Sequence, residues 1–140
     1  MKKVLFTCAL LLSAFNVYAQ TVPLTINIEG VSSDKGNILV GICASAEEFA
    51  EREPCKYSFS MPAEKGSMTK QVNIDKGRYG IIVYYDENGN NILDMAMFGK
   101  PKEKYGFSNN KYGPYGSKPP FEDALVKVNG STTVTIKLRK

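Results

Sequence analysis

Residues 78–85, Arg-Tyr-Gly-Ile-Ile-Val-Tyr-Tyr, form the strongest β-strand candidate in the chain and decide the fold prediction. The stretch is rich in β-branched and aromatic side chains, which suit a pleated and largely buried surface. The turn signal Asp75-Lys76-Gly77 stands directly before it. We therefore expect a strand near the centre of a sheet.

Further stretches on both sides are also strand candidates: most alternate apolar and polar residues, which is the two-residue period of a half-buried strand, whereas Ile38–Cys43 is apolar throughout and indicates a more buried strand. They are Val22–Gly30, Ile38–Cys43, Lys56–Met61, Met68–Ile74, Asp123–Val128 and Thr132–Leu138. We expect the first two to form a hairpin, and the last two to form another through Asn129-Gly130. About seven short strands with regular turn signals predict an all-β domain, an Ig-like or transthyretin-like antiparallel β-sandwich.

Two segments depart from this pattern. Ser45 and Glu48 make a capping box, which predicts a short helical turn over 45–51 with Phe49 facing inward. Residues 95–122 are rich in glycine, proline, lysine and aromatic residues. Because disordered segments usually contain few aromatic residues, we expect a long ordered loop there.

The first residues predict export. A basic start, a short apolar run and small residues before Gln20 are typical of a secretory signal peptide, here residues 1–19. The apolar run is shorter than a bilayer requires, so no membrane span is expected, although a retained helix or anchor is the alternative. Residues 20–140 then form a single domain in the periplasm or outside the cell.

Composition narrows the classes of function. The formal charge of +4 falls to +2 without Lys2 and Lys3, which is too mild to indicate nucleic-acid binding. Cys43 and Cys55 remain after export and are able to form a disulfide, the alternative being two reduced, buried thiols. The sequence does not predict an oligomeric state.

The chain contains no histidine. Catalytic triads, Cys-His pairs and imidazole metal ligands are therefore excluded. A hydrolase that uses carboxylates alone, such as Glu103 with Glu122 or Asp123, is the remaining enzymatic alternative. Nothing in the spacing of these acids requires it, so we expect no enzymatic activity.

Residues 86–94 carry the spacing of a calcium loop. Asp86, Asn88, Asn90 and Asp94 occupy loop positions 1, 3, 5 and 9, and the carbonyl of Ile92 is a further oxygen ligand. These residues predict a Ca²⁺ site of low affinity as the only expected cofactor.

Three departures weaken the calcium prediction, the first being that a strand and not a helix precedes the loop. Asn91 replaces the glycine of an EF-hand loop, and Met97 replaces its bidentate glutamate. Asn88-Gly89 is also a favoured hairpin turn, which needs no metal. A metal-free turn is therefore the alternative interpretation.

Rings beside glycine mark the long loop as a candidate binding surface. They are Tyr105, Phe107, Tyr112 and Tyr115, with several lysines around them. Exposed rings stack on sugar faces or on partner side chains, which predicts a glycan or a cell-envelope protein as partner. The alternative is that the rings pack inward and hold the loop against the domain.

Three stretches together resemble a known family: residues 84–94, residues 98–110 and residues 119–124. Their content and order are similar to the bacterial DUF2141 family. The resemblance covers nearly all of the chain after the leader. It implies an exported β-sandwich, and it implies no activity or catalytic residues.

Taken together, these patterns favour an exported, non-catalytic binding or accessory module. Loops on a rigid scaffold commonly carry binding sites. The alternatives are a structural or interaction domain without a small ligand, and the carboxylate-dependent hydrolase.

Overall fold

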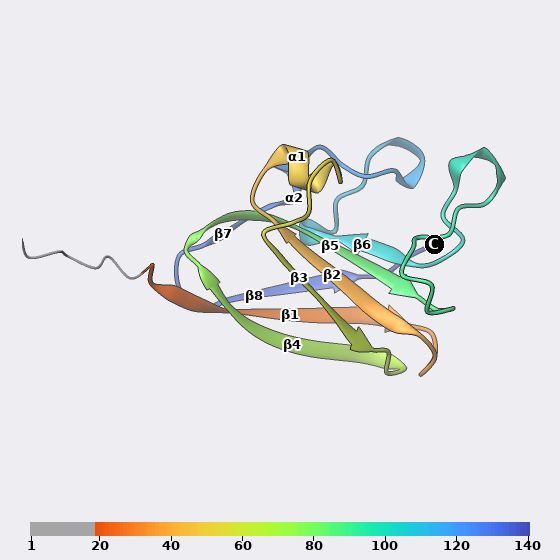
Figure 1. Cartoon of the computed structure of the whole chain (residues 1–140), viewed down its shortest axis with the longest axis horizontal. Coiled ribbons are helices and arrows are strands. Elements are labelled where there is room, and N and C mark those ends of the chain that lie inside the picture. Colours follow the sequence, from red (N-terminus) through yellow and green to blue (C-terminus); the bar gives the residue numbers. More distant parts are fainter. Residues whose placement is uncertain (1–18) are drawn as a thin grey trace, which may run out of the picture.

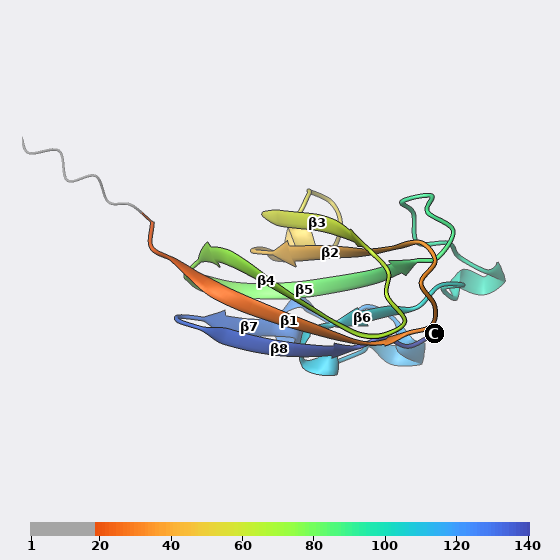
Figure 2. The same ribbon diagram turned by 90° about the horizontal axis from the view of Figure 1, so that it is seen from below.

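The computed structural model describes residues 19–140, so the predicted signal peptide lies outside the described residues except for Ala19. Two β-sheets pack face to face, which confirms the predicted all-β sandwich (Figure 1, Figure 2). The three-stranded sheet has the order β4-β1-β8, and the five-stranded sheet has the order β3-β2-β5-β6 with β7 also on β5. The strands are β1 (Thr21–Val31), β2 (Asn37–Cys43), β3 (Tyr57–Pro62), β4 (Gly66–Asp75), β5 (Gly77–Asp86), β6 (Tyr105–Phe107), β7 (Leu125–Val128) and β8 (Thr132–Lys137).

Strand β5 lies at the centre of the larger sheet, as its composition predicts. One edge pairs antiparallel with β2, and the other edge is shared by β7 near its start and β6 near its end. Its side chains alternate between two apolar clusters. Ile81 and Val83 belong to the core between the sheets, whereas Ile82 belongs to a cluster on the outer face.

The core between the sheets is built from this alternation. Leu24, Ile26 and Ile28 of β1 are fully buried, and so are Ile38 and Ile42 of β2. Each such side chain contributes about 1.5–3 kcal/mol when it leaves water. The core therefore holds the two sheets together and fixes the positions from which the loops at the ends of the strands project.

The two predicted hairpins are wrong. β1 pairs with β4 and β8, and β2 pairs with β3 and β5, so the turn after β1 carries the chain to the other sheet. The Asn129-Gly130 turn likewise connects β7 with β8 in the opposite sheet. The β1–β8 pair is parallel, so the sandwich is not purely antiparallel. A turn signal predicts that the chain reverses, but it does not specify which strand will be the partner.

The helical elements are short. Ser45 caps α1 (Ala46–Phe49), as the capping box predicts, and its Oγ accepts the Glu48 N–H at 3.2 Å. The predicted turn over 45–51 is therefore present but shorter. Within residues 19–140, no helix reaches the length and apolar character needed to cross a bilayer.

The predicted long loop over 95–122 is partly regular. It contains β6, the 3-10 turns η1 (Met97–Gly99), η2 (Ser108–Asn110) and η3 (Pro114–Gly116), and the start of α2 (Phe121–Ala124). Because α2 occupies 121–124, the strand predicted from Asp123 begins only at Leu125.

A second cluster fixes these elements to the outer face of the five-stranded sheet. The Phe49 ring lies 6.0 Å from Phe107 and 5.6 Å from Phe121, measured between centroids. Ser108 is buried beside them, accepting the N–H of Ile81 at 2.9 Å. Figure 1 shows α1 and α2 over this face, with the η1 and η3 loops projecting from the end where β5 finishes.

Candidate functional site

Asp86 ends β5, and its carboxylate organises the loop that follows. The side chain is only 1% exposed. Oδ1 accepts the N–H groups of Gly89 at 2.9 Å and Asn90 at 3.1 Å, and Oδ2 accepts that of Asn91 at 2.7 Å. A buried carboxylate of this kind satisfies three amides that a tight turn leaves without main-chain partners.

The other predicted calcium ligands meet on the exposed side of the same loop. Asp94 Oδ2 accepts a hydrogen bond from Asn88 Nδ2. Asn90 Nδ2 lies 3.1 Å from each of the two carboxylate oxygens of Asp94 and donates to them. Ile92 donates its N–H to Asn90 Oδ1 at 3.0 Å, and its side chain is exposed. In the part of the chain that the structure describes, no group of three or more His, Cys, Asp or Glu side chains is placed to hold a metal ion. Calcium at this loop stays a prediction, and the metal-free turn stays its alternative.

Glu103 fastens the far end of the loop. Its carboxylate is buried, with Oε1 accepting the N–H of Glu87 and Oε2 that of Asp94, both at 3.1 Å. The other acids considered for hydrolysis, Glu122 and Asp123, are exposed in α2. Glu103 therefore has a structural position, bridging two points of the Asp86 loop.

The four predicted ligand-binding rings have different environments. Tyr105 and Phe107 are buried under the loops, and the Tyr105 hydroxyl donates to the carbonyl of Gly116. Tyr112 is half-buried, with the Arg139 guanidinium 3.2 Å from its ring centroid. Tyr115 alone is fully exposed. Inward packing thus describes three of the four rings.

A groove, which we call the loop groove, lies between the two projecting loops and has a volume of about 770 Å³. Tyr84, Tyr105 and Phe107 are part of its lining from strands β5 and β6. Residues from 92–101 line it from one loop, and residues from 114–118 line it from the other. A concave, mostly apolar site of this size is typical of ligand-binding pockets.

The large apolar side chains that are exposed in residues 19–140 all lie at this end of the sandwich. They are Ile92, Met95, Met97, Phe98 and Tyr115. Exposed apolar side chains scattered singly over a surface are ordinary, but a group confined to one place marks an interaction site.

Phe98 and Tyr115 are presented in the same way. Each stands at the middle of a five-residue loop closed by a main-chain hydrogen bond, from Ala96 N to Lys100 O at 2.6 Å and from Gly113 N to Ser117 O at 2.8 Å. Each has a left-handed backbone, with φ of 67° and 56° respectively. That conformation is strained for an aromatic residue and tends to occur at functional positions. The fold thus presents two aromatic tips, Phe98 and Tyr115, in a strained backbone conformation, one on each side of the loop groove.

A polar network crosses the wall of the loop groove. The Tyr84 hydroxyl donates to Glu51 Oε1 at 2.8 Å, and Lys118 Nζ donates to Glu51 Oε2 at 2.7 Å and to the carbonyl of Phe49 at 2.8 Å. Burial, and to a lesser extent the Glu51 charge, raises the pKa of Tyr84 far above its ordinary value. Tyr84 is therefore a neutral donor at physiological pH.

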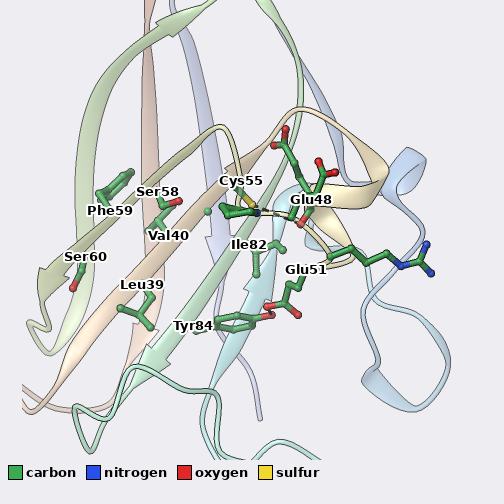
Figure 3. A pocket seen from close by; sticks show the side chains of 14 residues that line it. Leu39, Val40, Glu48, Glu51, Cys55, Ser58, Phe59, Ser60, Ile82 and Tyr84 are labelled. Carbon is green, nitrogen blue, oxygen red and sulfur yellow. Dashed lines mark hydrogen bonds between the residues drawn. The ribbon is translucent and has the colours of Figure 1, made fainter.

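A second groove of about 660 Å³ shares Glu51 and Tyr84 with the first. It lies on the outer face of the five-stranded sheet, where Leu39, Ile82 and Tyr84 form an apolar surface (Figure 3). Figure 3 shows the Glu51 carboxylate reaching over this surface to the Tyr84 hydroxyl. The network therefore separates two neighbouring hollows.

A family model described as "Uncharacterized protein conserved in bacteria (DUF2141)" matches residues 26–137. The chain belongs to the DUF2141 family. No curated protein and no solved structure matches it. The resemblance found in the three sequence stretches is thus confirmed, and the family description assigns no activity to this DUF2141 chain.

A disulfide closes the segment of the DUF2141 domain that carries Glu51. Cys43 at the end of β2 bonds to Cys55, with 4.3 Å between their Cα atoms. Cys55 lies over Gly41, where its Sγ is 3.0 Å from the position a Cβ would occupy. The disulfide therefore holds the wall between the two grooves against the sheet.

Sequence reasoning on this DUF2141 chain did not select the apolar residues of the first loop as binding residues. The sequence predicts a role for Ile92 only through its carbonyl oxygen, and it places Phe98 in an ordered loop without a binding role. A signal was present, because Phe98-Gly99 and Tyr115-Gly116 are both aromatic residues followed by glycine. The spacing alone does not distinguish rings that face solvent from rings such as Tyr105 that face the sheet.

Proposed function

We propose that this DUF2141 chain is an exported, non-catalytic binding module of the bacterial cell envelope, with the loop groove as its binding site. The observation that carries the proposal is the confinement of the exposed large apolar side chains of residues 19–140 to this one end. Exposing such side chains to water is unfavourable, and a partner that covers them gains about 25 cal/mol for each Å² of apolar surface buried.

Two features support export. The basic and apolar start of the sequence is typical of a secretory leader. The disulfide between Cys43 and Cys55 suits an oxidising compartment such as the periplasm or the cell exterior.

The polar groups of the loop groove favour an apolar partner surface over a glycan. Tyr84 and Lys118 both donate to the Glu51 carboxylate, and the Tyr105 hydroxyl donates to the carbonyl of Gly116. Sugar recognition depends on hydrogen bonds from placed polar groups, and these groups are already engaged.

Titration with anilinonaphthalene sulfonate, an apolar anionic fluorophore, tests the binding site. We expect saturable binding that is weakened about tenfold or more when Phe98→Ser and Tyr115→Ser are combined. Leu39→Ser is the matched control, because Leu39 lines only the second groove. Absence of saturable binding, or equal loss in the control, would favour the structural domain without a ligand.

A further inference from the structure

We infer that the two aromatic tips dock this domain on an anionic membrane surface, with Phe98 and Tyr115 entering the interface between headgroups and acyl chains. The inference rests on the proposed function, because it names the partner that the loop groove end would take. It requires no membrane-spanning segment.

The rings at the two tips are fully open to solvent. Phe98 and Tyr115 have relative exposures of 101% and 108%, so neither ring is sheltered by the groove beside it. Met97, next to Phe98 on the same tip, is 82% exposed. Aromatic side chains are favoured at the membrane–water boundary.

Main-chain contacts hold both tips in place. The 96–100 and 113–117 loops are each closed by a main-chain hydrogen bond, and the first is also closed by a β-bridge between Met95 and Pro101. The rings are thus held in place before any partner arrives, so docking costs little conformational entropy.

The segment that carries the two tips is positively charged. Residues 92–118 contain five lysines and two acidic residues, whereas the other residues from 19 to 140 are slightly acidic in sum. Lys100 directly follows the Phe98-Gly99 tip, and its side chain is exposed. Apart from Lys118, which is paired with Glu51, these lysines favour anionic headgroups, and each strengthens binding to such a surface about fivefold.

An extended peptide is the alternative partner. A peptide that adds to a sheet needs a free strand edge. In the loop groove the nearest strand, β6, pairs with β5 on one side, and Tyr105 makes a bridge with Arg139 on the other. Main-chain recognition of a peptide is therefore blocked at this strand, and a lipid surface needs no such edge.

Tryptophan fluorescence tests the inference sharply, because the chain contains no tryptophan. Phe98→Trp places a single reporter on one tip. Asn129→Trp is the control, since the β7–β8 turn lies at the opposite end of β5, where Val128 pairs with Gly77. The variants are mixed with vesicles of equal parts phosphatidylethanolamine and phosphatidylglycerol, and with vesicles of phosphatidylcholine alone.

We expect the Phe98→Trp emission to shift to shorter wavelength and to be quenched by brominated acyl chains in the anionic vesicles, with no change for Asn129→Trp. Tyr115→Ser in the reporter background should weaken the binding about tenfold. Lys100→Glu should also weaken it about tenfold, whereas Lys70→Glu on β4 should leave it within twofold.

Three results would overturn the inference: no shift with anionic vesicles, equal quenching of both reporters, or equal binding to phosphatidylcholine. Circular dichroism melting of each variant excludes unfolding as the cause of a loss. If the fluorophore still binds saturably while the vesicles do not, the proposed binding module stands and only the membrane partner is wrong.

Discussion

The hydroxyl of Tyr84 donates a 2.8 Å hydrogen bond to Oε1 of Glu51 and so ties the sheet to the disulfide-closed segment. Glu51 has a left-handed backbone, with φ of 61°, and its carboxylate also forms a salt bridge with Lys118. One carboxylate therefore connects the central strand, the α1 segment and the loop that presents Tyr115.

Tyr84 gives the domain a specific alkaline sensitivity. Its pKa is raised in the folded state, mainly by burial, so its stabilising contribution is complete below the unfolded pKa of about 10. Above that pH the unfolded chain loses the proton while the folded chain keeps it, and the free energy of unfolding falls.

Urea unfolding of Tyr84→Phe, followed from neutral pH to above pH 10, checks this sensitivity. We expect a loss of about 0.5–1.5 kcal/mol at neutral pH from the missing hydrogen bond, and a shallower alkaline decline. Tyr79 and Tyr112 also have raised pKa values and remain in the variant, so the decline should be reduced rather than abolished. Tyr115→Phe is the control and should match the parent chain at every pH.

Asp86 should be the most sensitive position of its loop. Asp86→Ala leaves three turn amides without acceptors, and we expect the free energy of unfolding to fall by about 1–3 kcal/mol. Asp86→Asn retains one oxygen and should lose less. The exposed Glu87→Ala is the control, and equal effects of Asp86→Ala and Glu87→Ala in urea unfolding would contradict this structural role.

Calcium gives a separate test of the same loop. The Asp86 oxygens accept main-chain amides and Asp94 accepts two asparagine amides, an arrangement that supports the metal-free turn. We expect calorimetric melting to be the same in millimolar calcium and in chelator. A calcium site filled at a hundred times its dissociation constant would add about 2.7 kcal/mol, and that result would restore the calcium interpretation.

Gly80 is required by the close packing of rings over the central strand. A Cβ at this position would lie 2.8 Å from a Phe49 carbon and 3.0 Å from two Phe121 carbons. Gly80→Ala should therefore destabilise the domain by about 1–3 kcal/mol in urea unfolding. At Gly130 an added Cβ meets no heavy atom within 4 Å, so Gly130→Ala should have little effect.

The strands were predictable because burial on one or two faces leaves a direct pattern in the sequence. Leu24, Ile26 and Ile28 alternate with polar residues, and Ile81-Ile82-Val83 is apolar throughout because both faces of β5 are covered. The strand partners were not predictable in the same way. Asn129-Gly130 predicts a hairpin, but the two strands that it connects pair elsewhere, β7 with β5 and β8 with β1.

The candidate site was predictable only in part, for a related reason. Sequence reasoning located the loop rings but could not rank them by exposure, since Tyr105 and Tyr115 have the same aromatic–glycine context. Their environments are decided by tertiary contacts, with Tyr105 in β6 under the loops and Tyr115 at a strained loop centre. Exposure at Phe98 depends likewise on its left-handed φ.

Because β1 pairs with β8, the three-stranded sheet is completed only after most of the chain has been synthesised. β1 is held between β4 and the last strand, so a chain that stops before Thr132 leaves one edge of its first strand uncovered. Contacts between such distant segments slow folding and expose unpaired edges until the end of the chain is available. The three-stranded sheet of a nascent polypeptide therefore cannot be completed before β8 has emerged from the ribosome.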